Sequence, residues 1–128
     1  MFTAEQFRIF IDHRACDIVH PDVMFAGGLH ETRRIADYAE LNHLAMAMHG
    51  NGGALAAIAA AHVAAASRCF LGLEYHFIET PWIGAFARRD IPLFEEGCIR
   101  LTDAPGLGVE LDLDVCRRHL APGERGWE

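Results

Sequence analysis

The sequence predicts an α/β protein built from about three βα units and followed by an irregular C-terminal part. Helical and strand-like patterns alternate three times within residues 1–76. Each unit takes roughly twenty-five to thirty residues, which is typical of βα units around a parallel sheet. From residue 77 onward, Pro, Gly, Trp and charged residues become frequent and no periodicity is sustained until about residue 112. We therefore predict one domain over residues 1–128, with the C-terminal part packed over the units.

The first helix is predicted over residues 4–14. Its apolar residues recur at helical spacing, namely Phe7, Phe10 and Ile11. Thr3 and Gln6 stand three residues apart, as in an N-terminal capping box. The sequence therefore predicts that these two side chains cap the helix.

Strands and helices alternate after this first helix. Strands are predicted over residues 16–25, 43–49 and 70–76, which are rich in apolar residues. Amphipathic helix 29–42 is expected to face the core with Leu29, Ile35, Tyr38 and Leu41. Helix 54–67 is almost entirely small or apolar, so we predict that it is buried.

The C-terminal part, residues 77–128, has fewer regular patterns. The stretch DAPGLGVEL at residues 103–111 predicts a turn followed by an extended segment. A short helix is predicted over residues 112–120. Neither feature indicates a second domain, because both are too short to bury a core of their own.

Composition excludes several classes of partner. The chain has 128 residues, a formal net charge of −7 and 11 basic residues, all of them Arg. This charge argues against nucleic acid or an anionic membrane as partner, because both require a basic face. The longest apolar run is rich in Ala and interrupted by His62, which favours a buried helix over a membrane span.

The four cysteines are widely spaced and form no CxxC pair, so a structural zinc site is not expected. The N-terminal stretch has no basic leader with a cleavage site. Reduced thiols in a cytoplasmic protein are the simplest interpretation. We expect the cysteines to fill small spaces in the core rather than to act as nucleophiles.

Each of the three predicted strands ends near an ionisable residue. These residues are Asp22, His49 and Glu74. In a parallel α/β sheet, ligands bind at the carboxyl ends of the strands. With neighbouring strands about 4.8 Å apart, Asp22 and His49 are near enough to hydrogen-bond, and Glu74 flanks the histidine on its other side.

This arrangement indicates acid–base chemistry. A carboxylate bonded to one imidazole nitrogen fixes the tautomer and leaves the other nitrogen free to exchange a proton. The stretch GNGG that follows His49 carries few side chains. We interpret this bare loop as room for a substrate to approach the imidazole.

Other polar residues are candidates for substrate contact. His20 lies two residues before Asp22 and so on the same face of an extended strand, where it either lines the pocket or packs inside the sheet. Asn51 and His76 are further possible substrate contacts. His62 is expected to be structural, and the remaining histidines are expected on the surface: His13, His30, His43 and His119.

The chain resembles the mandelate racemase and muconate lactonising enzyme family of the enolase superfamily. The matching stretches are DIVHPDVMFAGGLHETRRIADYAE, AMHGNGG, AHVAAASRCFLGLEYH and DAPGLGVELD. The resemblance implies a partial (β/α)8-type barrel, in which the three units correspond to the sixth, seventh and eighth. It also implies that Asp22 and His49 form the Asp–His dyad of the mandelate racemase branch, and that Glu74 meets the substrate carboxylate.

Family members remove the proton next to a carboxylate while Mg2+ stabilises the resulting enediolate. The resemblance favours a sugar-acid dehydratase, with a carboxylate-bearing small molecule as substrate. A racemase or cycloisomerase of the same family is the alternative. A racemase of this branch would also use a Lys on the second barrel strand, a part that does not correspond to any stretch of this sequence.

The family draws its Mg2+ ligands from the third, fourth and fifth strands, which also have no counterpart here. We therefore expect a C-terminal fragment that carries no metal ligand and is inactive alone. A non-catalytic assembly module is the other hypothesis, because three units leave the first and third strands unpaired. Such edges favour an oligomer or association with another chain.

Overall fold

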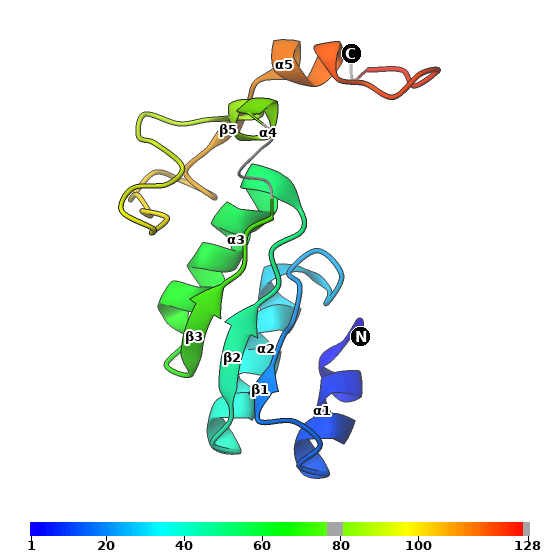
Figure 1. Cartoon of the computed structure of the whole chain (residues 1–128), viewed down its shortest axis with the longest axis vertical. Coiled ribbons are helices and arrows are strands. Elements are labelled where there is room, and N and C mark those ends of the chain that lie inside the picture. Colours follow the sequence, from blue (N-terminus) through cyan, green and yellow to red (C-terminus); the bar gives the residue numbers. More distant parts are fainter. Residues whose placement is uncertain (77–80, 127–128) are drawn as a thin grey trace.

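The computed structural model describes residues 1–76 and 81–126 and contains the predicted parallel sheet. Its strands are β1 (Ile18–Val19), β2 (Ala45–Met48) and β3 (Phe70–Leu73), in the order β1-β2-β3. Both pairings are parallel, and the register of β2 against β3 shifts once, between Met46 and Ala47. The strands lie side by side in Figure 1 and carry their carboxyl ends toward the same edge of the sheet. All three strands are shorter than predicted.

Three helices pack around this sheet. They are α1 (Ala4–Asp12), α2 (Gly28–Leu41) and α3 (Gly53–Ala66), and α2 and α3 cover the same side of the sheet. The core between them includes Ile11, Ile35 and Met46, each fully buried. Helix α3 buries mostly alanines, and these small side chains let the helix approach the sheet closely. The predicted order of helices and strands is therefore confirmed.

Two of the predicted core contacts of α2 are wrong. Leu29 is 42% exposed and Leu41 is 77% exposed. The buried stripe of α2 instead runs along Thr32, Ile35, Ala36 and Ala39. This stripe follows the spacing of three and four residues that puts side chains on one helix face, and Leu41 lies outside it. Leu29 stands three residues before Thr32 but lies in the first turn of α2, where its side chain is left exposed.

The capping box predicted at Thr3 and Gln6 is also absent. Thr3 occupies the N-cap position, but its side chain makes no capping hydrogen bond. The Gln6 Oε1 accepts from the Phe2 N–H at 2.8 Å, one residue before the position that a capping box requires. The Ala4 N–H donates to Glu31 Oε1 at 2.8 Å. A carboxylate of α2 therefore satisfies the start of α1.

The C-terminal part contains more regular structure than the sequence predicts. It comprises α4 (Pro81–Ala85), β4 (Ala87–Arg88), β5 (Glu110–Leu111) and α5 (Leu113–Arg118), with β4 and β5 antiparallel. These elements lie beyond the carboxyl ends of the strands in Figure 1. The predicted extended segment and final helix correspond to β5 and α5. Helix α4 and strand β4, which the sequence did not predict, are too short to leave a clear periodicity.

Two histidines make contacts in this C-terminal part. His62 joins it to α3, and His119 makes a contact within it. The His62 Nε2 lies 3.3 Å from the Leu107 carbonyl oxygen, which agrees with its predicted structural role. The His119 ring was expected to be solvated but stacks on Trp82, with ring centroids 4.4 Å apart.

Among the described residues, no helix has both the length and the hydropathy needed to cross a membrane.

Candidate active site

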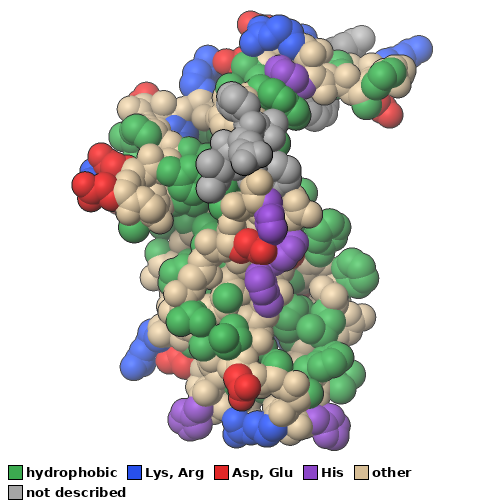
Figure 2. Space-filling model, viewed as in Figure 1, with side chains coloured by type: hydrophobic (Ala, Val, Ile, Leu, Met, Phe, Trp, Pro, Cys, Tyr) green, Lys and Arg blue, Asp and Glu red, His purple; other side chains and the backbone are tan. Residues whose placement is uncertain are grey.

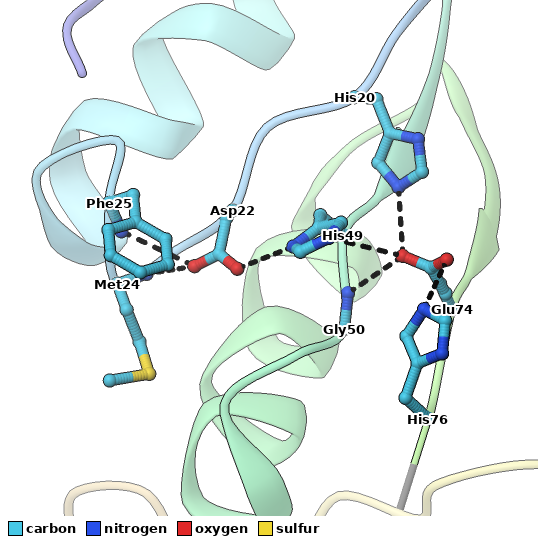
Figure 3. A network of polar contacts seen from close by, with 8 residues as sticks. All are labelled: His20, Asp22, Met24, Phe25, His49, Gly50, Glu74 and His76. Carbon is cyan, nitrogen blue, oxygen red and sulfur yellow. Dashed lines mark hydrogen bonds and ion pairs between the residues drawn. The ribbon is translucent and has the colours of Figure 1, made fainter. Parts of the chain in front are cut away.

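Asp22 and His49 form the contact that their strand-end positions predict. The His49 Nδ1 lies 2.7 Å from Asp22 Oδ2 (Figure 3). An ionised carboxylate can only accept a hydrogen bond, so we assign the proton to Nδ1. This assignment leaves His49 Nε2 as the nitrogen that can exchange a proton.

The backbone holds both members of this pair in place. The His49 N–H donates to the Pro21 carbonyl oxygen at 3.0 Å, which continues the β1–β2 pairing past the end of the strands. The second carboxylate oxygen of Asp22 accepts from the Met24 N–H at 2.8 Å and the Phe25 N–H at 3.3 Å. The side chain of Asp22 is only 10% exposed. Its carboxylate therefore has little freedom to turn away from the imidazole.

Glu74 lies at the centre of three imidazoles, as Figure 3 shows. Its Oε1 lies 2.7 Å from His76 Nε2. Its Oε2 lies 3.3 Å from the Gly50 nitrogen, 3.4 Å from His20 Nε2 and 3.6 Å from His49 Nε2. The carboxylate therefore flanks His49 on the side opposite Asp22.

The pKa of Glu74 is lowered by this environment. Burial is the largest influence and by itself raises the pKa, because it penalises the charged form. The hydrogen bond from the Gly50 N–H, the hydrogen bond from His76 and the nearby imidazoles act in the opposite direction and together outweigh it. Glu74 is therefore a carboxylate at neutral pH.

This shift predicts a pH-dependent contribution of Glu74 to stability. A carboxyl group whose folded pKa is lowered stabilises the fold above its unfolded pKa, and this contribution is lost as the pH falls through the folded pKa. We expect Glu74→Gln to lower the free energy of unfolding at pH 7 and to have a smaller effect at pH 3. Urea denaturation of both proteins at the two pH values measures this difference. An equal effect at both pH values would contradict the prediction.

Gly50 explains the bare loop after His49 in a way the sequence did not reveal. A Cβ on Gly50 would lie 1.5 Å from the Glu74 carbonyl oxygen and 2.4 Å from the Glu74 carbonyl carbon. The Gly50 N–H also donates to the Glu74 side chain, and its carbonyl oxygen accepts from the His76 N–H at 3.4 Å. Close contact with the chain after β3 therefore requires glycine at position 50. From the sequence alone, the lack of side chains in this loop indicates only room for a substrate.

Five of the six candidate residues come together. His20 faces Glu74, which favours the pocket-lining interpretation over packing inside the sheet. Asn51 is exposed and lies apart from the group formed by His20, Asp22, His49, Glu74 and His76. It lines a separate groove of about 660 Å³, together with Trp82 and Leu120. The reason is that the chain turns away from the strand ends directly after Gly50, toward the start of α3.

The five-residue group is open to solvent on one face. In Figure 2, purple histidine side chains gather around a red carboxylate near the middle of the face shown. The side chains of His49 and Glu74 are 35% and 33% exposed. Both side chains are thus half-buried.

These residues do not fit a Mg2+ ion. Both oxygens of Asp22 face the His49 ring or backbone N–H groups, and both oxygens of Glu74 face nitrogens. Within residues 1–76 and 81–126, no group of three or more His, Cys, Asp or Glu side chains could hold a metal ion. Mg2+ requires several oxygen ligands in octahedral geometry. The described residues of this group are therefore suited to proton transfer and binding.

The sequence model of the family described as enolase C-terminal domain-like matches residues 1–115. The chain belongs to this family. The enolase C-terminal domain also explains the parallel sheet with helices, and an open sheet of three units is consistent with part of a barrel. The resemblance to mandelate racemase and muconate lactonising enzymes is confirmed by solved structures. A mandelate racemase/muconate lactonizing enzyme-like protein from Rubrobacter xylanophilus has a TM-score of 0.94 and 41% identity, over 99% of this chain and 32% of that one.

Curated relatives with this enolase C-terminal domain include sugar-acid dehydratases. The D-xylonate dehydratase of Haloferax volcanii is 38% identical over 117 residues, which cover 91% of this chain and 28% of the relative. The arabinonate dehydratase of Saccharolobus solfataricus is 30% identical over 119 residues, which cover 86% of this chain and 29% of the relative. This chain thus spans less than a third of the length of these two enzymes.

Proposed function

We propose that this chain supplies the proton-transfer residues of a sugar-acid dehydratase. The Asp22–His49 contact of 2.7 Å is the observation that carries the proposal. It fixes one imidazole nitrogen and leaves Nε2, which lies 3.6 Å from Glu74 Oε2, to exchange a proton. The sugar-acid dehydratases among its relatives support a substrate with a carboxylate and neighbouring hydroxyl groups.

His49 has the central role in this proposal. Dehydration removes a proton from the carbon next to the carboxylate and a hydroxyl group from the following carbon. His49 Nε2 takes the proton, and the resulting imidazolium, held by Asp22, can return it to the departing hydroxyl group as water. Acid–base catalysis of this kind contributes about 10²- to 10⁴-fold in rate.

Glu74 and the remaining histidines are assigned to substrate binding. A lone carboxylate would repel an anionic sugar acid. Here the imidazoles of His20 and His76 flank that carboxylate and provide N–H donors for a second anion. We propose that the substrate carboxylate binds among these rings, next to Glu74, with its α-carbon toward His49 Nε2. Mg2+, which the family uses, must then be held by residues other than those described here.

A chimera tests the proposed function. In it, this chain replaces the matching 117-residue segment of the Haloferax volcanii D-xylonate dehydratase. We expect the chimera to convert at least one of a panel of sugar acids to the 2-keto-3-deoxy acid in the presence of Mg2+. The isolated chain, assayed in parallel, should give no product. A folded chimera with no activity on any sugar acid would contradict the proposal.

Pairing with another chain is a second candidate function. The edge strands β1 and β3 expose apolar side chains, with Ile18 45% and Leu71 61% exposed. A module that only pairs through these edges has no need of His49. Dependence of the chimera on His49 therefore separates the two functions.

A further inference from the structure

The site contains a second carboxylate–imidazole contact, between Glu74 and His76. The distance from Glu74 Oε1 to His76 Nε2 is 2.7 Å, as short as the contact between Asp22 and His49. The two residues are separated by one position and follow β3, so their side chains leave the same side of the extended chain. The His76 backbone is itself fixed, because its N–H donates to the Gly50 carbonyl oxygen.

The two oxygens of Glu74 have different neighbours. The Gly50 N–H, the His20 ring and the His49 ring all face Oε2. Within the described part of the chain, His76 is the residue that contacts Oε1. Loss of the His76 ring would free Oε1, and the carboxylate could then rotate away from His49.

We propose that His76 is a positioning residue, which holds Glu74 in its charged form with Oε2 turned toward His49. The importance of this role for turnover rests on the proposed function. The contact itself does not, because it exists in the chain without a substrate. The lowered pKa of Glu74, to which the His76 hydrogen bond contributes after that of Gly50, agrees with this role.

The titration of Glu74 in the chain itself tests the proposal. The chain is labelled with ¹³C at the glutamate side-chain carboxyl, and the chemical shift of Glu74 is followed against pH by NMR. We expect His76→Ala to raise the midpoint of this titration. His76→Gln, which keeps an N–H donor but no ring that can become charged, should raise it by a smaller amount.

Two further variants serve as controls. His20→Ala removes a ring that lies 3.4 Å from Oε2, and we expect it to raise the midpoint less than His76→Ala does. His30→Ala, at an exposed position in α2, should leave the midpoint unchanged. Backbone amide spectra confirm that each variant is folded, and His76 is itself exposed, so a loss of fold is not expected.

An unchanged midpoint in His76→Ala would overturn the proposal, as would a larger shift in His20→Ala. Neither measurement involves turnover. An inactive chimera would therefore contradict the dehydratase function and leave the role of His76 to be judged by the titration alone. An unchanged titration midpoint of Glu74 in His76→Ala would likewise leave the assignment of His49 as the proton-transfer group untouched.

Discussion

Replacement of His49 by Asn in the dehydratase chimera should lower kcat by about 10²- to 10⁴-fold, the usual contribution of a general acid–base group. The affinity for the sugar acid should change little, because the amide of Asn removes the proton-transfer group but few ground-state contacts. Steady-state kinetics with the best substrate of the panel measure both quantities. The matched control is His30→Asn, which changes an exposed histidine outside the five-residue group and should leave kcat unaffected.

The other residues of the site should give graded losses. Asp22→Asn should cost less than His49→Asn, because the imidazole remains and only its tautomer and basicity are disturbed. Glu74→Gln should fall between the two, because it removes a carboxylate that lies 3.6 Å from His49 Nε2 and stabilises the imidazolium formed on proton transfer. Near-normal turnover in His49→Asn would end the assignment of this histidine as acid or base.

Gly50→Ala should be the most destabilising single substitution in the loop after β2. The new Cβ would lie within 2.4 Å of two backbone atoms of Glu74, and backbone atoms cannot move aside as the end of a flexible side chain can. Overpacking typically costs 1–3 kcal/mol and occasionally more, and we expect about 3 kcal/mol or more here. Urea denaturation of the chain measures this loss.

Gly72→Ala provides a control on the neighbouring strand. A Cβ on Gly72 would meet nothing within 4 Å, so we expect its effect on the free energy of unfolding to stay within about 1 kcal/mol. The NMR titration of Glu74 gives a second measurement, because Gly50→Ala should also disturb the hydrogen bond to Glu74 Oε2. Similar stability of the two variants would show that the chain adapts to a side chain at Gly50.

The sequence predicted the order of helices and strands in residues 1–76 and the bounds of the helices well, because these patterns arise from burial. Helices α1, α2 and α3 begin and end within about two residues of the predicted bounds. The exposed Leu29 and Leu41 show the limit of this reasoning. An apolar residue at the end of a helix fits several helix faces, and only the packed structure decides which face is covered.

The pairing of Asp22 with His49 could also be predicted, since it follows from topology. Residues just after neighbouring parallel strands meet at one edge of the sheet. The convergence of His20 and His76 on a single carboxylate could not be predicted with the same certainty. It depends on the direction of each chain after its strand and on the register shift between β2 and β3.

The role of Gly50 and the position of Asn51 were beyond prediction for a related reason. A glycine in a loop is compatible with many conformations, and the sequence does not reveal which backbone approaches it. The loop turns toward α3 at this glycine, which removes Asn51 from the site and brings the chain after β3 into contact. Such contacts depend on tertiary structure rather than on a local pattern.

The order of the strands in space has a consequence for how the site is assembled during folding. Since β1, β2 and β3 pair in their order along the chain, each contact of the site joins one βα unit to the next or lies within a unit, except for that of His20 with Glu74. Asp22 and His49 are 27 residues apart, and Gly50 and Glu74 are 24 apart. Contacts of such moderate separation need only short loops to close. As the chain leaves the ribosome, the Asp22–His49 pair can form before Glu74 has emerged.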